Sequence, residues 1–138
     1  MKPLNTLGKY ERIKSRKLVQ ALFEGRQQFS LFPFRIAWML LPASNPAPEP
    51  LQAAFSVGKR YFKRAHHRNR IRRQIKEAYR LQKSPIQQVL LENQIGLRVF
   101  ISYTGNEPPT YTFIEEKIQA LMHRLEKIIL NATHAEKN

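Results

Sequence analysis

The stretch KRAHHRNRIRRQIKEAYR, residues 63–80, combines a helical pattern of apolar residues with a dense set of cations. At about 100° per residue, one apolar stripe runs along it: Ile71, Ile75, Ala78 and Tyr79. The opposite ridge is polar and basic: Asn69, Arg73, Lys76 and Arg80. Like charges at positions i and i+4 destabilise a free helix by about 0.2–0.5 kcal/mol per pair, so this helix needs its stripe packed. The pattern predicts a helix over about 64–82, buried on one side and basic on the other.

Strands are predicted on both sides of this helix. LQAAFSVG (51–58) alternates between a larger apolar set (Leu51, Ala53, Phe55, Val57) and a smaller set (Gln52, Ala54, Ser56, Gly58). IGLRVFISY (95–103) reads as a further strand. Ser84-Pro85 should end the helix, leaving 86–93 as a short helical turn. These elements form a β-α-β unit whose two strands either pair side by side or have a third strand between them.

The flanking segments complete one α/β domain. A first helix is expected over 16–24, capped by Ser15 and stopped by Gly25. A strand should cover 29–41 with an interruption at Pro33, and a last helix should run from a capping box of Thr112 and Glu115 to about 130. PASNPAPEP (42–50) is predicted to be an exposed connector, and GNEPP (105–109) a turn.

The chain length of 138 residues suits a single domain, 1–138, with an ordered core over about 10–130. The predicted fold is an α/β (α+β) two-layer sandwich, in which three helices pack on a small mixed sheet of three to four strands.

The charge of the chain indicates a polyanionic partner. Its net charge is +14, and ten of its 24 Lys and Arg lie within residues 59–80 beside one acid, Glu77. A solvated surface helix would normally mix both signs, and Arg suits bidentate phosphate contacts. Nucleic acid is therefore the first candidate and an anionic membrane the second. The N-terminus has no apolar signal core, and the longest apolar run, IAWMLL (36–41), is far shorter than a membrane span, so we expect a cytoplasmic protein.

The acidic residues argue against a protein nuclease centre. There is no Asp and no Cys, and the ten Glu are scattered, so no carboxylate cluster for Mg²⁺ is predicted. His66 and His67 are adjacent and diverge by about 100° on a helix, which favours capping or RNA contact over metal binding. No spacing of the four His favours acid–base catalysis. We predict no catalytic and no metal-binding residues in this chain.

The stretch FSVGKRYFKRAHHRNRIRRQIKEAYRL (55–81) resembles the signature of the bacterial ribonuclease P protein family. That signature is a small-residue strand ending in two basic residues, then R-N-R-[IV]-[KR]-R, then an acidic-aromatic-Arg tail. The matching residues are Ser56, Val57, Lys59 and Arg60, then Arg68 to Arg73, then Glu77, Tyr79 and Arg80. With the first helix LVQALFEG, the resemblance extends over about 10–130.

The resemblance implies a subunit of a ribonucleoprotein that removes the 5′ leader of precursor tRNA. Its partners would be a catalytic RNA, which holds the Mg²⁺, and the leader; no organic cofactor is expected, and the protein would act as a monomer. It also implies a left-handed β-α-β crossover, against the usual right-handed rule. The implied RNA-binding residues are Lys59, Arg60, Lys63, Arg64, His67, Arg68, Asn69, Arg70, Arg72, Arg73, Lys76 and Arg80.

The family also holds the single-stranded leader in a cleft, where aromatic rings stack on bases. The corresponding positions are Val19, Phe23, Arg35, Ala37 and Ser56. Phe23 matches a stacking position, but Val19 and Ala37 stand where aromatic residues are often found. Arg35, Arg98 and Phe100 fall on the same side of the sheet and are candidates to compensate, while Trp38 should face the core. The alternative function is a general RNA-binding module, such as a ribosomal protein or an RNA chaperone.

Overall fold

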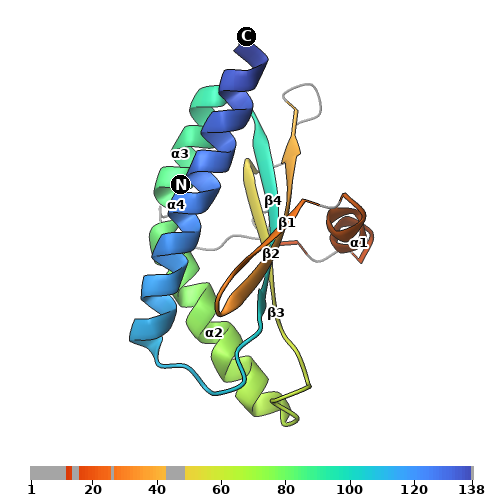
Figure 1. The fold of residues 1–138 in the computed structure, drawn as a ribbon, viewed down its shortest axis with the longest axis vertical. Helices are drawn as coiled ribbons and strands as arrows, with labels where there is room; N and C mark the ends of the chain where they lie inside the picture. The colour runs from red at the N-terminus through yellow and green to blue at the C-terminus, as the bar shows by residue number, and fades with distance from the viewer. Residues whose placement is uncertain (1–11, 14–15, 26, 43–48, 138) are drawn as a thin grey trace.

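The computed structural model describes residues 12–13, 16–25, 27–42 and 49–137. Figure 1 shows helices and strands in the following order: α1 (Arg16–Glu24), β1 (Gln28–Leu31), β2 (Phe34–Leu41), β3 (Leu51–Val57), α2 (Ala65–Gln82), α3 (Ser84–Asn93), β4 (Gly96–Tyr103) and α4 (Tyr111–Lys137). The proposed cap at Ser15 and most of the connector 42–50 lie outside the described residues.

The strands form one mixed sheet in the order β1-β2-β4-β3. β3 and β4 are parallel neighbours, with Ala53 opposite Val99, whereas β2 is antiparallel to both β1 and β4. The β-α-β unit therefore joins two strands that pair directly. The left-handed sense of this crossover stays a prediction of the resemblance.

The interruption predicted at Pro33 is confirmed, but the chain also reverses direction at Phe32-Pro33, so the predicted strand 29–41 is two paired strands. β1 and β2 pair antiparallel with Leu31 opposite Phe34, and the Phe32-Pro33 peptide is cis. Proline has no backbone N–H to give to a sheet, so it marks the end of a ladder. Alternation of apolar residues continues through the turn, which is why the two strands look like one in the sequence.

The helices also differ from the prediction in number and in their ends. Residues 84–93 form a full helix, α3, with Pro85 in its first turn, where no backbone N–H donor is needed, so the described residues contain four helices rather than three. The last helix begins before Thr112: the Thr110 hydroxyl oxygen accepts the Phe113 N–H at 3.2 Å and caps α4. The predicted Thr112–Glu115 capping box is therefore wrong, and α4 continues to Lys137, beyond 130.

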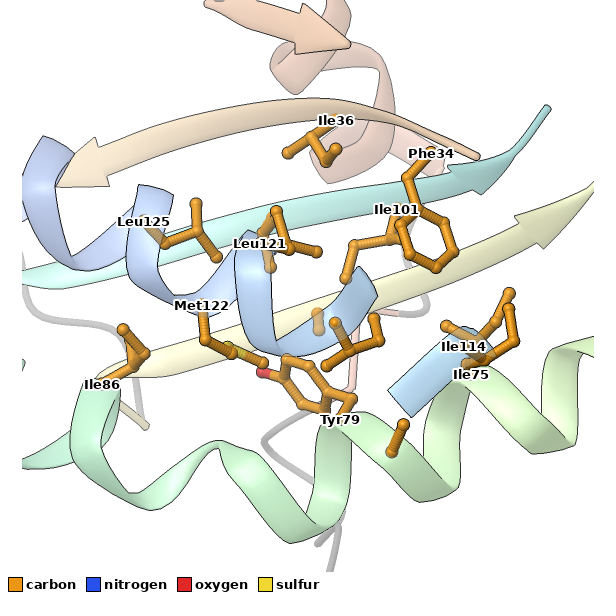
Figure 2. Close-up of a cluster of buried hydrophobic side chains, with 14 of the residues drawn as sticks. Phe34, Ile36, Ile75, Tyr79, Ile86, Ile101, Ile114, Leu121, Met122 and Leu125 are labelled. Carbon is orange, nitrogen blue, oxygen red and sulfur yellow. The ribbon is translucent and has the colours of Figure 1, made fainter. Parts of the chain in front are cut away.

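Three helices, α2, α3 and α4, cover one face of the sheet, and α1 lies on the other face (Figure 1). Figure 2 shows the main core, where side chains of the three helices such as Ile75, Ile86 and Leu121 meet Ile36 and Ile101 of the sheet. All five are 1% exposed or less. The smaller cluster under α1 contains Ile13, Leu22 and Ala37. The layered α/β prediction is confirmed, with α1 as an addition on the second face.

Within the described residues, no helix has both the length and the apolar character that crossing a membrane requires.

Candidate nucleic-acid interface

Helix α2 is held by the apolar stripe that the sequence predicts. Ile71, Ile75, Ala78 and Tyr79 are each 2% exposed or less. They face α4 and β3, and the Tyr79 ring meets Phe55 of β3 edge-on, with 5.2 Å between centroids. Burial of about 1.5–3 kcal/mol per large apolar side chain outweighs the repulsion between neighbouring cations. The basic side of α2 is thereby fixed on the outside of the molecule.

The predicted RNA-binding cations are not equivalent in the structure. Arg70 and Arg73 are exposed, and neither side chain makes a hydrogen bond or an ion pair with any described residue. Arg68 instead turns back, and its Nη1 donates to the carbonyl oxygens of Phe62 at 2.8 Å and Lys63 at 2.9 Å. Arg68 therefore fixes the loop that leads into α2, in addition to carrying charge.

A basic hollow lies on the outer side of α2, lined by His66, Asn69, Arg72, Arg73 and Lys76. Arg72 Nη1 donates to Asn69 Oδ1 at 3.0 Å, which orients the guanidinium. The Nε of Arg72 is buried and has no hydrogen-bond partner among the described residues. Three cations, Arg72, Arg73 and Lys76, line the hollow and no carboxylate does, so it is suited to an anion.

Arg12, which was not among the predicted RNA-binding residues, lies close enough to the basic hollow to act on the charge of Lys76. Residues 12–13 lie along the outer edge of β3, where Ile13 N–H donates to the Ala53 carbonyl at 2.9 Å. Burial lowers the pKa of Lys76, and the nearby Arg72 and Arg12 lower it further. Arg12 lies more than 50 positions from the helix, and no local pattern connects the two segments.

Arg80 is already paired with the one acid of α2. Its Nη2 donates to Glu77 Oε1 at 2.6 Å and its Nε to Glu77 Oε2 at 3.1 Å. This hydrogen bonding lowers the pKa of Glu77 and raises the pKa of Arg80. The pair is electrically neutral, so Arg80 contributes less to the positive field of the helix than its place in the ridge suggests.

The histidines at the start of α2 lie closer together than their backbone angle suggests. The His66 and His67 rings are 4.1 Å apart between centroids, and both side chains are exposed. Nowhere in the part of the chain that the structure describes do three His, Cys, Asp or Glu side chains come together as metal ligands would.

The loop between β3 and α2 presents the other predicted cations: Lys59, Arg60, Lys63 and Arg64, all exposed. The Arg60 guanidinium lies over the Tyr61 ring, 5.3 Å from its centre, and Tyr61 itself is 52% exposed. An exposed ring beside Arg offers stacking as well as charge. The loop begins after Val57, one residue beyond Ser56, so it connects the basic helix with the strand that carries Ser56.

The predicted leader-cleft residues lie on that second face but do not all reach the surface. Ala37 is 3% exposed and lies beneath α1, so its side chain faces the α1 core. Val19 and Phe23 line a hollow on the outer side of α1. The Phe23 ring is 43% exposed and meets Phe100 of β4 edge-on, with 5.2 Å between centroids.

Phe100 therefore stands beside the stacking position that Phe23 occupies. This is the place expected of a ring that compensates for the missing aromatic residues at Val19 and Ala37. Arg98 is less available, because its Nε donates to Gln52 Oε1 at 3.0 Å across the parallel strands. Trp38 lies on the opposite face and packs against the main core.

A row of hydroxyl groups crosses the sheet next to α1. Ser56 of β3 is opposite Ser102 of β4, which is opposite Arg35 of β2, and Arg35 is opposite Ser30 of β1. Cross-strand partners share a face, so these four side chains form one line. Ser30 and Ser102 were not predicted, because their alignment depends on the pairing of four strands.

Comparison with known proteins adds family evidence to this geometry. The family model described as Ribonuclease P matches residues 7–126. The ribonuclease P protein component of Porphyromonas gingivalis is 31% identical over 119 residues, covering 86% of this chain and 85% of its own. That of Rippkaea orientalis is 29% identical over 128 residues, with 91% and 89% covered.

The fold has a solved counterpart. The structure of the Staphylococcus aureus RNase P protein superposes with a TM-score of 0.66 at 18% identity, covering 85% of this chain and 96% of that chain. The R-N-R helix, the sheet order and these matches lead to one conclusion. This chain belongs to the ribonuclease P protein family, whose members are the protein component of the ribonuclease that processes the 5′ ends of tRNA.

Proposed function

We propose that this protein binds the catalytic RNA of ribonuclease P through α2 and its preceding loop, and the 5′ leader of precursor tRNA through the α1 face. The observation that carries the first part is the basic hollow at His66, Asn69, Arg72, Arg73 and Lys76. A phosphate group there would lie close to the cations of Arg72, Arg73 and Lys76, and the exposed Arg73 guanidinium would donate hydrogen bonds to it. Such contacts position a folded RNA without reading its sequence.

The leader proposal rests on the two kinds of groups that meet beside α1. Phe23 offers an exposed ring, backed by Phe100, on which a base of any identity can stack. The line of Ser56, Ser102 and Arg35 offers hydroxyl donors and one cation for the sugar–phosphate backbone. This combination favours a single strand of varied sequence, as leaders are.

The chemical step is assigned to the RNA partner in this proposal. The chain has no Asp, and its described His and Glu side chains do not gather in threes, so Mg²⁺ is expected mainly at RNA phosphates. The protein contributes charge neutralisation and positioning. Action as a monomer, in the cytoplasm and without an organic cofactor belongs to the same proposal.

Reconstitution tests the proposal directly. The protein is mixed with a bacterial ribonuclease P RNA at low Mg²⁺, and cleavage of precursor tRNA is compared with cleavage by the RNA alone. We expect the protein to increase cleavage, and a lack of stimulation would refute the proposal. Competition with bulk RNA separates it from the general RNA-binding alternative, which would show no preference for the catalytic RNA.

The leader contact is tested with Phe23→Ala. Loss of one stacked base should weaken binding of leader-bearing tRNA by about 1–3 kcal/mol and leave binding of mature tRNA unchanged. Leu91→Ala, which removes a 60% exposed apolar side chain from α3, is the matched control. An equal effect of Phe23→Ala on both tRNAs would place Phe23 outside the leader site.

A further inference from the structure

A second surface with rings and cations lies at the sheet edge farthest from β3, the strand against which α2 packs. We call it the β1-edge surface; its residues are Phe29, Phe32, Phe113, Lys117 and Arg124. Phe32, in the turn between β1 and β2, is 66% exposed. Its ring meets Phe113 of α4 edge-on, with 6.5 Å between centroids. Exposure of so large an apolar ring beside a second one is a feature of binding surfaces.

A cationic side chain lies over each of the two partly buried rings of this surface. Lys117 Nζ lies 5.6 Å from the centre of the Phe113 ring, and Arg124 Cζ lies 4.5 Å from the centre of Phe29. Neither cation forms an ion pair with any described residue. Both charges therefore remain available to an anion, while the rings fix where the cations sit.

Charge is segregated around α4. At about 100° per residue, Phe113, Lys117 and Arg124 fall within about 40° of one another. The acids of the same stretch lie outside that sector: Glu115, Glu116 and Glu126. On the far flank, Gln82 of α2 donates to the Glu115 carbonyl, which places that side against α2. The flank toward β1 therefore carries two cations and no acid over residues 113–133; its neutral members there include Ala120 and Asn131.

A hollow adjoins the exposed Phe32 ring and the partly buried Phe113 ring. Phe32, Phe113, Pro108 and Pro109 supply apolar walls, and Glu107 stands at the same hollow. The Tyr103 hydroxyl also lines it but already donates to the Glu107 carbonyl at 2.6 Å. A flat apolar group fits these walls better than a phosphate would, because Glu107 repels anions. Phosphates would instead lie toward Lys117 and Arg124.

We propose that the β1-edge surface binds an unpaired stretch of RNA, with bases against Phe32 and Phe113 and phosphates toward Lys117 and Arg124. Rings that alternate with cations are the arrangement that holds single strands, because every base has a stacking face. The bases of a duplex could not stack on Phe32, because their faces are already stacked on neighbouring base pairs. The proposal stands on this surface alone and does not depend on which RNA α2 holds.

Fluorescence provides a direct test. Phe32→Trp places an indole at the surface, and a short single-stranded RNA of mixed sequence is added to the intact protein. We expect quenching beyond that of the wild type, whose Trp38 gives the background, and beyond that of Leu91→Trp on α3. Equal quenching in all three proteins would overturn the proposal. Since this RNA is generic, the result is independent of precursor-tRNA processing.

Affinity measurements then identify the RNA. Phe32→Ala should weaken binding at least about fivefold, the lower end of a stacking contribution, and Leu91→Ala should not. Lys117→Glu should weaken it more than Lys127→Glu, which has the same net charge but points about 80° away on α4. If the variants lose affinity for ribonuclease P RNA in the absence of precursor tRNA, the unpaired stretch belongs to that RNA. A loss that appears only with a long-leader precursor tRNA assigns it to the leader.

Two results of the affinity measurements would also contradict the proposal. In one, Phe32→Ala and Lys117→Glu bind every RNA as well as their controls do. In the other, Phe32→Ala changes self-association of the protein while RNA affinities stay constant, which would make the surface a protein contact.

Discussion

Arg73 offers a quantitative test of how α2 holds RNA. It is exposed in the basic hollow, and its side chain makes no hydrogen bond or ion pair with the described residues. Arg73→Ala lowers the net charge from +14 by one. Lys127→Ala makes the same change of charge at an exposed position on α4, so it serves as the matched control.

The expected magnitude follows from counterion release. One phosphate neutralised on a duplex contributes about 0.9 to the slope of log K against log salt concentration. Arg73→Ala should therefore flatten the slope for ribonuclease P RNA by about 0.9. Between about 50 and 200 mM salt, the affinity of the variant should then fall three- to fourfold less than that of the wild type. Lys127→Ala should leave the slope unchanged.

The Glu77–Arg80 pair supplies the contrasting case. Its two hydrogen bonds, at 2.6 and 3.1 Å, join opposite charges, so the double variant Glu77→Gln/Arg80→Gln removes the pair without changing net charge. We expect its salt slope to equal that of the wild type. The assay is fluorescence anisotropy of labelled RNA over a salt series. The reasoning fails if Arg73→Ala and Lys127→Ala have equal slopes, or if the double variant flattens the slope as Arg73→Ala does.

Three further predictions concern stability. Ile75→Ala, at a fully buried anchor of α2, should lower the free energy of unfolding by about 2–5 kcal/mol in denaturant titrations, whereas the exposed Leu91→Ala stays within about 0.5 kcal/mol. Thr110→Ala should lower the free energy of unfolding by about 0.5–2 kcal/mol, and Thr112→Ala should leave it almost unchanged. The reverse result would mean that Thr112 is the cap, as the sequence predicted. Burial and a nearby carboxylate raise the pKa of Tyr103, so its contribution to stability is complete below its unfolded pKa of about 10 and is lost as pH rises through the folded value. Tyr103→Phe should flatten this alkaline loss, and an unchanged pH profile would contradict that assignment.

Local patterns were enough to predict α2 and the strands around it. The apolar stripe of Ile71, Ile75, Ala78 and Tyr79 is buried as periodicity predicts, because a helix repeats its faces within a few residues. The same holds for the alternation of β4, which pairs with β2 and β3 over its full length. The family resemblance also depends on one contiguous segment, so it was available without coordinates.

The errors occurred where two local signals compete. Pro33 interrupts an alternating run, and only pairing of Leu31 with Phe34 shows that the chain turns back there. Pro85 ends α2 but also starts α3, because proline suits a first helical turn. Thr110 and Thr112 can both cap a helix by residue type, and the structure shows the Thr110 hydroxyl accepting the Phe113 N–H.

The sequence by itself determined that this protein has a basic helix with a buried stripe, between two strands, and that it belongs among RNA-binding proteins. Only the tertiary structure decided which residues come near one another across long separations. Arg12 lies near Lys76, Ser56 aligns with Ser102 and Arg35 across the sheet, and the Phe32 ring meets Phe113. The physical reason is that periodicity describes one element at a time. Strand order and helix packing, which bring distant elements together, depend on how all the apolar faces are buried at once.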